Sequence, residues 1–173
     1  MADPRLQAAY NSQCCAVAAI VSLAHVLGCP DVKTQDALLV RTDLFPEWKD
    51  KDVPGATAND EGTFKRLGDL VGLKFLQSTS VALGDISAAQ KLKEDFQTRF
   101  ESGMGAILYL HGAEAQGSWD SNHVCTLVGI VGDKARIMTA SQLLASFEDI
   151  SFEDFAKHTE FVWFEQESLS PTK

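Results

Sequence analysis

The stretch that decides the fold is Asn11–Gly28, which reads NSQCCAVAAIVSLAHVLG. From Ala16 to Leu27 it contains no Asp, Glu, Lys or Arg, and it is rich in alanine. It ends at Gly28, a residue type that commonly terminates helices in the left-handed conformation. Because a helix that is apolar on all sides belongs inside a domain, the sequence predicts a buried central helix here.

Two adjacent cysteines, Cys14 and Cys15, stand where this helix begins. Free backbone N–H groups and the positive end of the helix dipole stabilise a thiolate over a thiol at such a position. Either cysteine is a candidate nucleophile at this position, with Cys15 preferred and Cys14 as the alternative. Both thiols also fit a purely structural interpretation, as small buried side chains of a core helix.

The composition narrows the class of protein. The 173 residues suffice for one domain that buries roughly two thirds of its unfolded surface. Fifteen basic and 24 acidic residues give a net charge of −9 without a Lys/Arg cluster, which argues against nucleic acid or an anionic membrane as partner. No apolar run reaches the roughly 18 residues of a membrane span. The four cysteines lack paired CxxC spacing, so we expect no metal site and no cofactor.

The N-terminus and the cysteines bear on localisation. Met1–Arg5 contains no basic segment that leads into an apolar core, so it does not resemble a secretory signal. Cysteines without a disulfide pattern favour a reducing compartment. We therefore expect a cytoplasmic protein, with an exported and processed effector as the alternative.

The first part of the chain, 1–103, is expected to be mainly helical. The patterns predict a short helix at Ala37–Arg41, a helix from Asn59 or Asp60 to Val71, a strand at Lys74–Ser80 and an amphipathic helix from Asp85 or Ser87 to Gly103. The irregular segment 43–59 contains Phe45 and Trp48. This segment is interpreted either as an exposed loop or as a wall of a substrate site.

The second part, 104–167, is expected to form an antiparallel sheet, followed by a frayed tail at 168–173. The patterns predict strands at Ala106–Leu110, His123–Val131, Ala135–Thr139 and Phe161–Phe164, a hairpin turn at Gly132–Asp133 and a short helix at Ser151–Phe155. The predicted fold class is α+β. A single domain over 1–173 packs its buried, cysteine-bearing helix on the C-terminal sheet.

A cysteine nucleophile needs a base, and His123 is the best candidate because it opens an apolar strand. His111, which ends the preceding apolar run, is the rival. Trp119, shortly before His123, either lines the site or fills the core of its loop. The chain thus carries a cysteine at the head of a helix and, much later, a histidine at the start of a strand.

This order resembles the papain-like superfamily, in particular the C39-type bacteriocin-leader peptidases and the phytochelatin synthases. The pieces that carry the resemblance are Gln7, Cys15–Ala19 (CAVAA), His123–Gly129 (HVCTLVG) and Asp149–Phe155 (DISFEDF). The resemblance implies a papain-like fold and a catalytic Cys15–His123 pair. It further implies that the Gln7 side chain and the Cys15 backbone N–H bind the oxyanion, with Gln13 as the alternative to Gln7.

Three positions depart from that pattern. Ala16 replaces the family's glycine after the nucleophile, and Gln7 precedes Cys15 by eight residues rather than six or seven. The family's Asp or Asn that orients the histidine corresponds to a place near Thr139. A hydroxyl stabilises an imidazolium much less than a carboxylate does. Either Thr139 takes this role, or the site is degenerate and binds without cutting.

These residues lead to three hypotheses of function. The first is a thiol hydrolase or acyltransferase that acts on an amide or peptide bond of a peptide or protein substrate. The second is a catalytically degenerate papain-like domain that binds a peptide or protein partner. The third is a ubiquitin-directed cysteine protease of the Josephin type, which shares the upstream Gln, the helix-head Cys and the late His. The sequence leaves the oligomeric state open.

Overall fold

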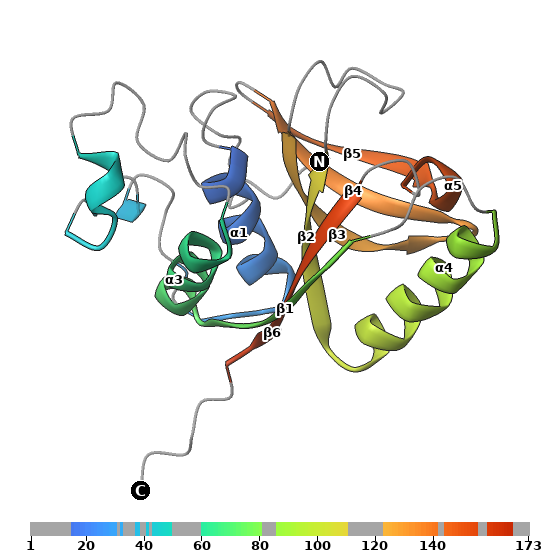
Figure 1. The fold of residues 1–173 in the computed structure, drawn as a ribbon, viewed down its shortest axis with the longest axis horizontal. Helices are drawn as coiled ribbons and strands as arrows, with labels where there is room; N and C mark the ends of the chain where they lie inside the picture. The colour runs from blue at the N-terminus through green and yellow to red at the C-terminus, as the bar shows by residue number, and fades with distance from the viewer. Residues whose placement is uncertain are drawn as a thin grey trace, which may run out of the picture.

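The computed structural model describes residues 15–30, 32, 37–38, 41, 43–49, 60–80, 86–110, 123–141, 144–155 and 159–167. For several residues in these ranges, including His123 and Thr139, the description covers the backbone alone. The described residues form a six-stranded antiparallel sheet with helices on both faces (Figure 1). The α+β class predicted from the sequence is confirmed.

The sheet joins strands from distant parts of the chain. In spatial order it runs β1-β6-β2-β3-β4-β5, and each neighbouring pair is antiparallel. The strands are β1 (Leu73–Ser80), β2 (Met104–Leu110), β3 (His123–Val131), β4 (Lys134–Ser141), β5 (Leu144–Ser151) and β6 (Thr159–Gln166). Because β1 pairs with β6, the sheet includes one strand from the mainly helical first part of the chain.

The helices divide between the two faces of this sheet. Helices α1 and α3 pack on one face, and α4 and α5 pack on the other (Figure 1). The helices are α1 (Cys15–Val26), the short 3-10 helix η2 (Pro46–Trp48), α3 (Glu61–Val71), α4 (Ile86–Glu101) and α5 (Phe152–Phe155). Each face of the sheet therefore has its own buried cluster.

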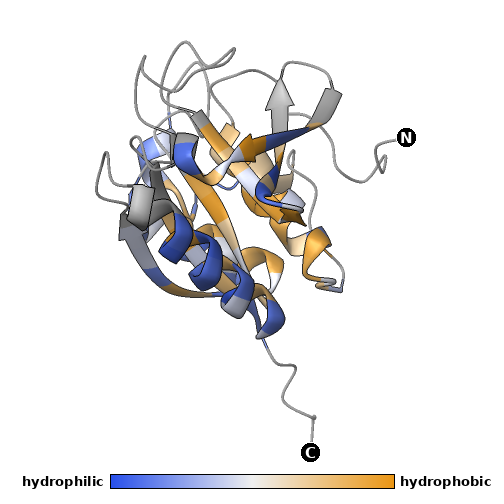
Figure 2. Cartoon of the chain, turned by 90° about the vertical axis from the view of Figure 1, so that its right-hand side faces the viewer, coloured by the Kyte–Doolittle hydropathy of each residue, from blue (hydrophilic) through white to orange (hydrophobic). Residues whose placement is uncertain are grey.

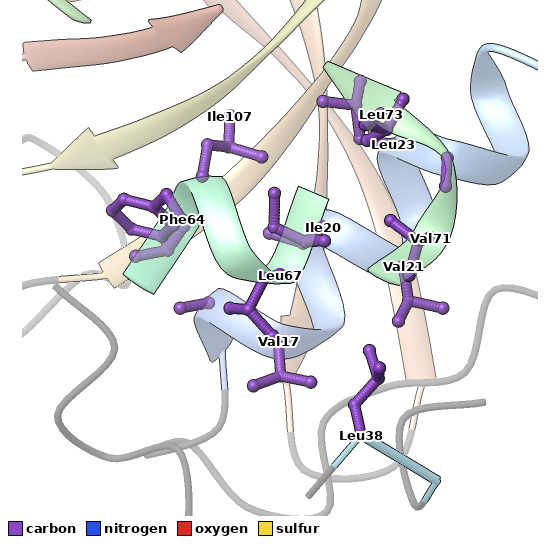
Figure 3. Close-up of a cluster of buried hydrophobic side chains, with 14 of the residues drawn as sticks. Val17, Ile20, Val21, Leu23, Leu38, Phe64, Leu67, Val71, Leu73 and Ile107 are labelled. Carbon is purple, nitrogen blue, oxygen red and sulfur yellow. The ribbon is translucent and has the colours of Figure 1, made fainter. Parts of the chain in front are cut away.

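The predicted central helix is confirmed as α1. Every residue from Cys15 to Ala24 is buried, as expected for a helix that is apolar on all sides. Gly28 ends it with φ 75°, which lets the Cys29 N–H donate to Ala24 O at 2.9 Å. Figure 3 shows the aliphatic side chains that α1 packs against α3 and β2: Val17, Ile20 and Val21 with Leu67, Val71 and Ile107.

Helix α3 also begins and ends as its sequence predicts. The Asp60 side chain accepts a hydrogen bond from the Thr63 N–H at 3.0 Å, and Gly72 ends the helix with φ 80°. Inside the helix, a Cβ at Gly68 would lie 2.9 Å from Phe164 Cε1 and 3.0 Å from Leu73 O. The missing side chain at this position lets α3 approach the sheet closely.

The opposite face of the sheet is built around aromatic rings. Phe96 of α4 makes edge-to-face contacts with Phe152, Phe161 and Trp163, with ring centroids 5.6, 4.9 and 5.2 Å away. The outward side of α4 is hydrophilic, as Figure 2 shows with this helix in front of the sheet. The amphipathic pattern of this segment is therefore a structural feature, as the sequence predicts.

Phe45 and Trp48 correct the interpretation of segment 43–59. Both rings are buried and stack with their centroids 4.0 Å apart, and the Arg66 guanidinium lies 5.1 Å from the Phe45 centroid. The pair belongs to the same buried cluster as α1 and α3. Both interpretations of these aromatics, exposed loop and substrate wall, are wrong, because the rings fill the core.

Strand β5 is absent from the sequence-based prediction. It pairs with β4 along its whole length, and Arg136 donates to both oxygens of the opposite Asp149 at 2.7 and 2.9 Å. Its sequence, LASFEDIS, lacks regular apolar alternation and carries two adjacent acidic residues. β5 is an edge strand, since only one of its sides has a neighbouring strand among the described residues. Edge strands often carry charged side chains, and such a sequence does not show the regular apolar pattern that predicts a strand.

Candidate active site

Cys15 is the first residue of α1 and lies on the side of the helix that meets the sheet. Its side chain is 8% exposed and belongs to the same buried cluster as Val124 of β3. The backbone N–H groups of Val124, Ala16 and Cys15 itself lower the pKa of the Cys15 thiol. Val124 directly follows His123, so Cys15 shares its buried cluster with the residue next to the predicted base.

The contact between α1 and β3 extends one helical turn beyond Cys15. The Thr126 hydroxyl donates a hydrogen bond to the Ala19 carbonyl at 2.9 Å, and both residues are buried. Cys125 and Leu127 belong to the cluster on the opposite face of the sheet. This alternation follows from the two-residue period of a β-strand. It directs Val124 and Thr126 towards α1.

The electrostatics of Cys15 differ from the sequence-based expectation. Burial raises the pKa of its thiol, and the N–H groups of Val124, Ala16 and Cys15 lower it without outweighing burial. The described surroundings therefore favour the thiol at neutral pH. Desolvation of the thiolate outweighs its stabilisation by these N–H groups, so a partner base is needed to ionise the thiol at neutral pH.

The Cys125 thiol is also buried. Burial raises the pKa of the Cys125 thiol well above its ordinary value, and negative charge on Cys15 and on Glu148 adds to this effect. Cys15, Cys29 and Cys125 are all free and buried. The prediction that Cys29 and Cys125 are small buried side chains is confirmed.

The other predicted site residues are described in part or not at all. The backbone of His123 opens β3 and pairs with Leu110. Met138 of β4 pairs with Thr126 of β3, and the two strands are antiparallel. Thr139, the next residue of β4, therefore lies towards the end of the sheet at which His123 begins β3. Gln7, Cys14 and Trp119, together with the rival base His111, lie outside the described residues.

Sequence reasoning missed the role of Thr126. A lone hydroxyl side chain in the apolar run Val124–Val131 was a usable signal, because a buried hydroxyl requires a hydrogen-bond partner. The identity of that partner was not readable, since Ala19 lies 107 residues away in the chain. Glu148, whose charge raises the pKa of Cys125, was also missed, because the sequence of β5 lacks the apolar alternation that predicts a strand.

Two further properties of the described residues bear on the class of site. No group of three or more His, Cys, Asp or Glu side chains there is arranged to hold a metal ion. No helix in the described ranges combines the length and the apolar character needed to cross a bilayer.

Comparisons with known proteins were made by family model and by sequence. No model of a known family matches this chain, and no curated protein matches it. Any functional hypothesis for this chain therefore depends on its residues and their arrangement.

Proposed function

We propose that this protein is a papain-like thiol hydrolase or acyltransferase that acts on an amide or peptide bond. The observation that carries the proposal is that α1 packs on β3: Cys15 shares a buried cluster with Val124, the residue after His123, and the Thr126 hydroxyl donates to Ala19 O at 2.9 Å. Cys15 heads a buried helix, and β3 is a central strand of an antiparallel sheet. These are the positions in which a Cys–His pair of this type is expected.

The proposed chemistry assigns one step to each group. His123 takes the thiol proton, and the Cys15 sulfur attacks the carbonyl carbon of the substrate. The Cys15 backbone N–H and the Gln7 side chain stabilise the oxyanion. His123 then protonates the leaving amine as the C–N bond breaks. Water or a second amine gives a proton to His123 and attacks the thioester carbonyl, and the C–S bond breaks so that the sulfur leaves as thiolate.

Cys29 offers an internal control for a test of this pair. Both thiols are 8% exposed, and burial raises the pKa of both. Cys29 follows the C-terminal end of α1, whereas Cys15 begins this helix. The Cys29 thiol donates a hydrogen bond to Gly72 O at 3.3 Å. Any difference in reactivity between the two thiols therefore reflects their neighbours rather than their exposure.

The experiment measures iodoacetamide labelling of each cysteine by peptide mass spectrometry between pH 5 and 10. With an imidazole partner, Cys15 should react at least about tenfold faster than Cys29 at pH 6–7. In His123→Ala this advantage should disappear, and labelling of Cys15 should rise only at a pH above the ordinary thiol pKa of about 8.5, because burial raises the Cys15 pKa. Equal rates for Cys15 and Cys29 in the wild-type protein would contradict the proposal.

A second candidate function is a degenerate domain that binds a peptide or protein without cutting it. Two observations favour it: Thr139 replaces a carboxylate, and burial raises the Cys15 pKa. This alternative predicts partner binding that survives Cys15→Ala, together with slow labelling of Cys15 in the wild-type protein. Rapid labelling that depends on His123 would exclude it.

A further inference from the structure

Thr126 is unusual among the residues that line the interface between α1 and the sheet. Its side chain is completely buried, and its neighbours on β3, Val124, Cys125 and Leu127, are apolar and buried. Valine would fill nearly the same volume in such a strand. The hydroxyl is therefore not needed for packing, and its hydrogen bond to Ala19 O needs another explanation.

The position of this hydrogen bond relates it to the proposed catalytic pair. Ala19 lies four residues after Cys15, which is about one turn or 6 Å along the helix. Thr126 lies three residues after His123, about 10 Å along the strand. The bond thus joins the two elements that carry the pair, close to both of its members.

The buried cluster between α1 and the sheet, as far as the structure describes it, consists mainly of apolar side chains. Its members include Ala16, Ala19 and Leu23 of α1 and Val124 and Ile107 of the sheet. Apolar contact is non-directional and opposes a small slide of the helix only weakly. A hydrogen bond depends steeply on distance and angle, so it fixes the position of the helix along its axis.

We propose that Thr126 is a positioning residue. Its hydrogen bond to Ala19 O fixes where α1 lies along β3, so that Cys15 at the start of the helix is held next to His123 at the start of the strand. This inference rests on the proposed function, because it assigns a role at the same site. A displacement of about 1 Å between reacting groups can reduce a rate by about a hundredfold. Loss of this one hydroxyl should therefore affect reactivity at Cys15 more than it affects the fold.

The test uses variants that differ in a single group. Thr126→Val removes the hydroxyl and keeps the volume, while Thr126→Ser keeps the hydroxyl. Thr79→Val is the matched control, since Thr79 accepts a hydrogen bond from Trp163 Nε1 at 2.9 Å on strand β1, away from α1. If Thr126→Val does not fold, Thr126→Ser and Thr126→Ala form a second pair that differs by one oxygen atom.

The readout is the pH profile of Cys15 labelling relative to Cys29, with folding followed by circular dichroism. Thr126→Val should lower the Cys15 rate at pH 7 by about tenfold or more and shift its profile towards that of an unassisted thiol. Thr126→Ser should stay within about threefold of the wild-type rate, and Thr79→Val should not change it. A folded Thr126→Val, or Thr126→Ala, with the wild-type profile would overturn the inference.

The wild-type profile separates failure of this inference from failure of the proposed function. If Cys15 has no advantage over Cys29 in the wild-type protein, the proposed function fails and the inference fails with it. If the advantage exists and survives loss of the hydroxyl, only the role of Thr126 is refuted.

Discussion

The two faces of the sheet are packed by different means. On the α4 face, large rings meet edge to face around Phe96. On the α1 face, aliphatic side chains such as Ile20 and Leu23 share a buried cluster with Ile107 and Val124 of the sheet, and the Thr126 hydroxyl bridges the interface. A Cβ at Gly105 of β2 would lie 2.7 Å from Leu23 Cδ1, which shows how close α1 comes to the sheet.

Because of this difference, we expect the α4 face to contribute mainly to the stability of the fold and the α1 face to position Cys15. Aromatic residues bury large areas and gain further from edge-to-face geometry, so the α4 face should contribute strongly to the free energy of unfolding. Small residues contribute less area but allow the backbones to approach. That approach places Cys15 in one buried cluster with Val124. Variants on the two faces should therefore have different effects, and the following predictions test this difference.

The largest effect on stability is expected at the centre of the aromatic face. Phe96 is completely buried, so Phe96→Ala should lower the free energy of unfolding by about 3–5 kcal/mol, as measured by urea denaturation. Phe147→Ala is the control, because Phe147 is 49% exposed and its removal should cost less than about 1 kcal/mol. If Phe96→Ala also changed the labelling rate of Cys15 in folded molecules, the two faces would not be independent.

A smaller loss of stability is expected where α3 meets the sheet. The Cβ of Gly68→Ala would press on Leu73 O, a backbone atom that cannot move away easily, and on the Phe164 ring. Overpacking costs about 1–3 kcal/mol, and the better helix propensity of alanine returns up to about 1 kcal/mol. We expect a net loss of about 1–2 kcal/mol by urea denaturation. Gly129→Ala, whose Cβ would meet nothing within 4 Å, should show no such loss.

The smallest effect is expected at the start of α3. Asp60→Ala should cost about 1 kcal/mol near pH 7, because Asp60 caps the helix through the Thr63 N–H. Burial opposes ionisation of Asp60, but hydrogen bonds from the Thr63 hydroxyl and N–H outweigh it and lower the pKa of the carboxyl.

The sign of its pH dependence follows from that lowered pKa. The stabilising effect of the charge is complete above the unfolded pKa of about 3.9, and it is lost as the pH falls through the lower folded value. The difference between wild type and Asp60→Ala should therefore shrink below pH ~4. Asp60→Asn keeps the cap without the charge and should lack this pH dependence. A difference that grows on acidification would contradict the assignment.

Much of the secondary structure could be predicted from the sequence. The central helix, α3 with its cap, α4 and the β3–β4 hairpin all lie close to their predicted ranges, because short-range patterns specify them. Strand β5 could not be predicted, since its stability depends on pairing with β4 rather than on its own pattern. The burial of Phe45 and Trp48 was missed for a similar reason. The two rings pack with residues of α1 and α3, and the loop-like composition of their own segment does not reveal this distant contact.

The candidate site divides in the same way. Cys15 at a helix N-terminus and His123 at a strand start are visible in the sequence as separate elements. The burial that raises the Cys15 pKa, and the link from Thr126 to Ala19, depend on which strand lies beneath the helix.

The sequence by itself determined where α1, α3 and α4 end, at Gly28, Gly72 and Gly103, because these ends depend on backbone conformation and bonds within one turn. Only the tertiary structure decided that β1 joins β6 and that α1 lies on β3. Such pairings depend on contacts between residues about a hundred positions apart, and no local pattern specifies which distant surface a buried helix or strand will meet.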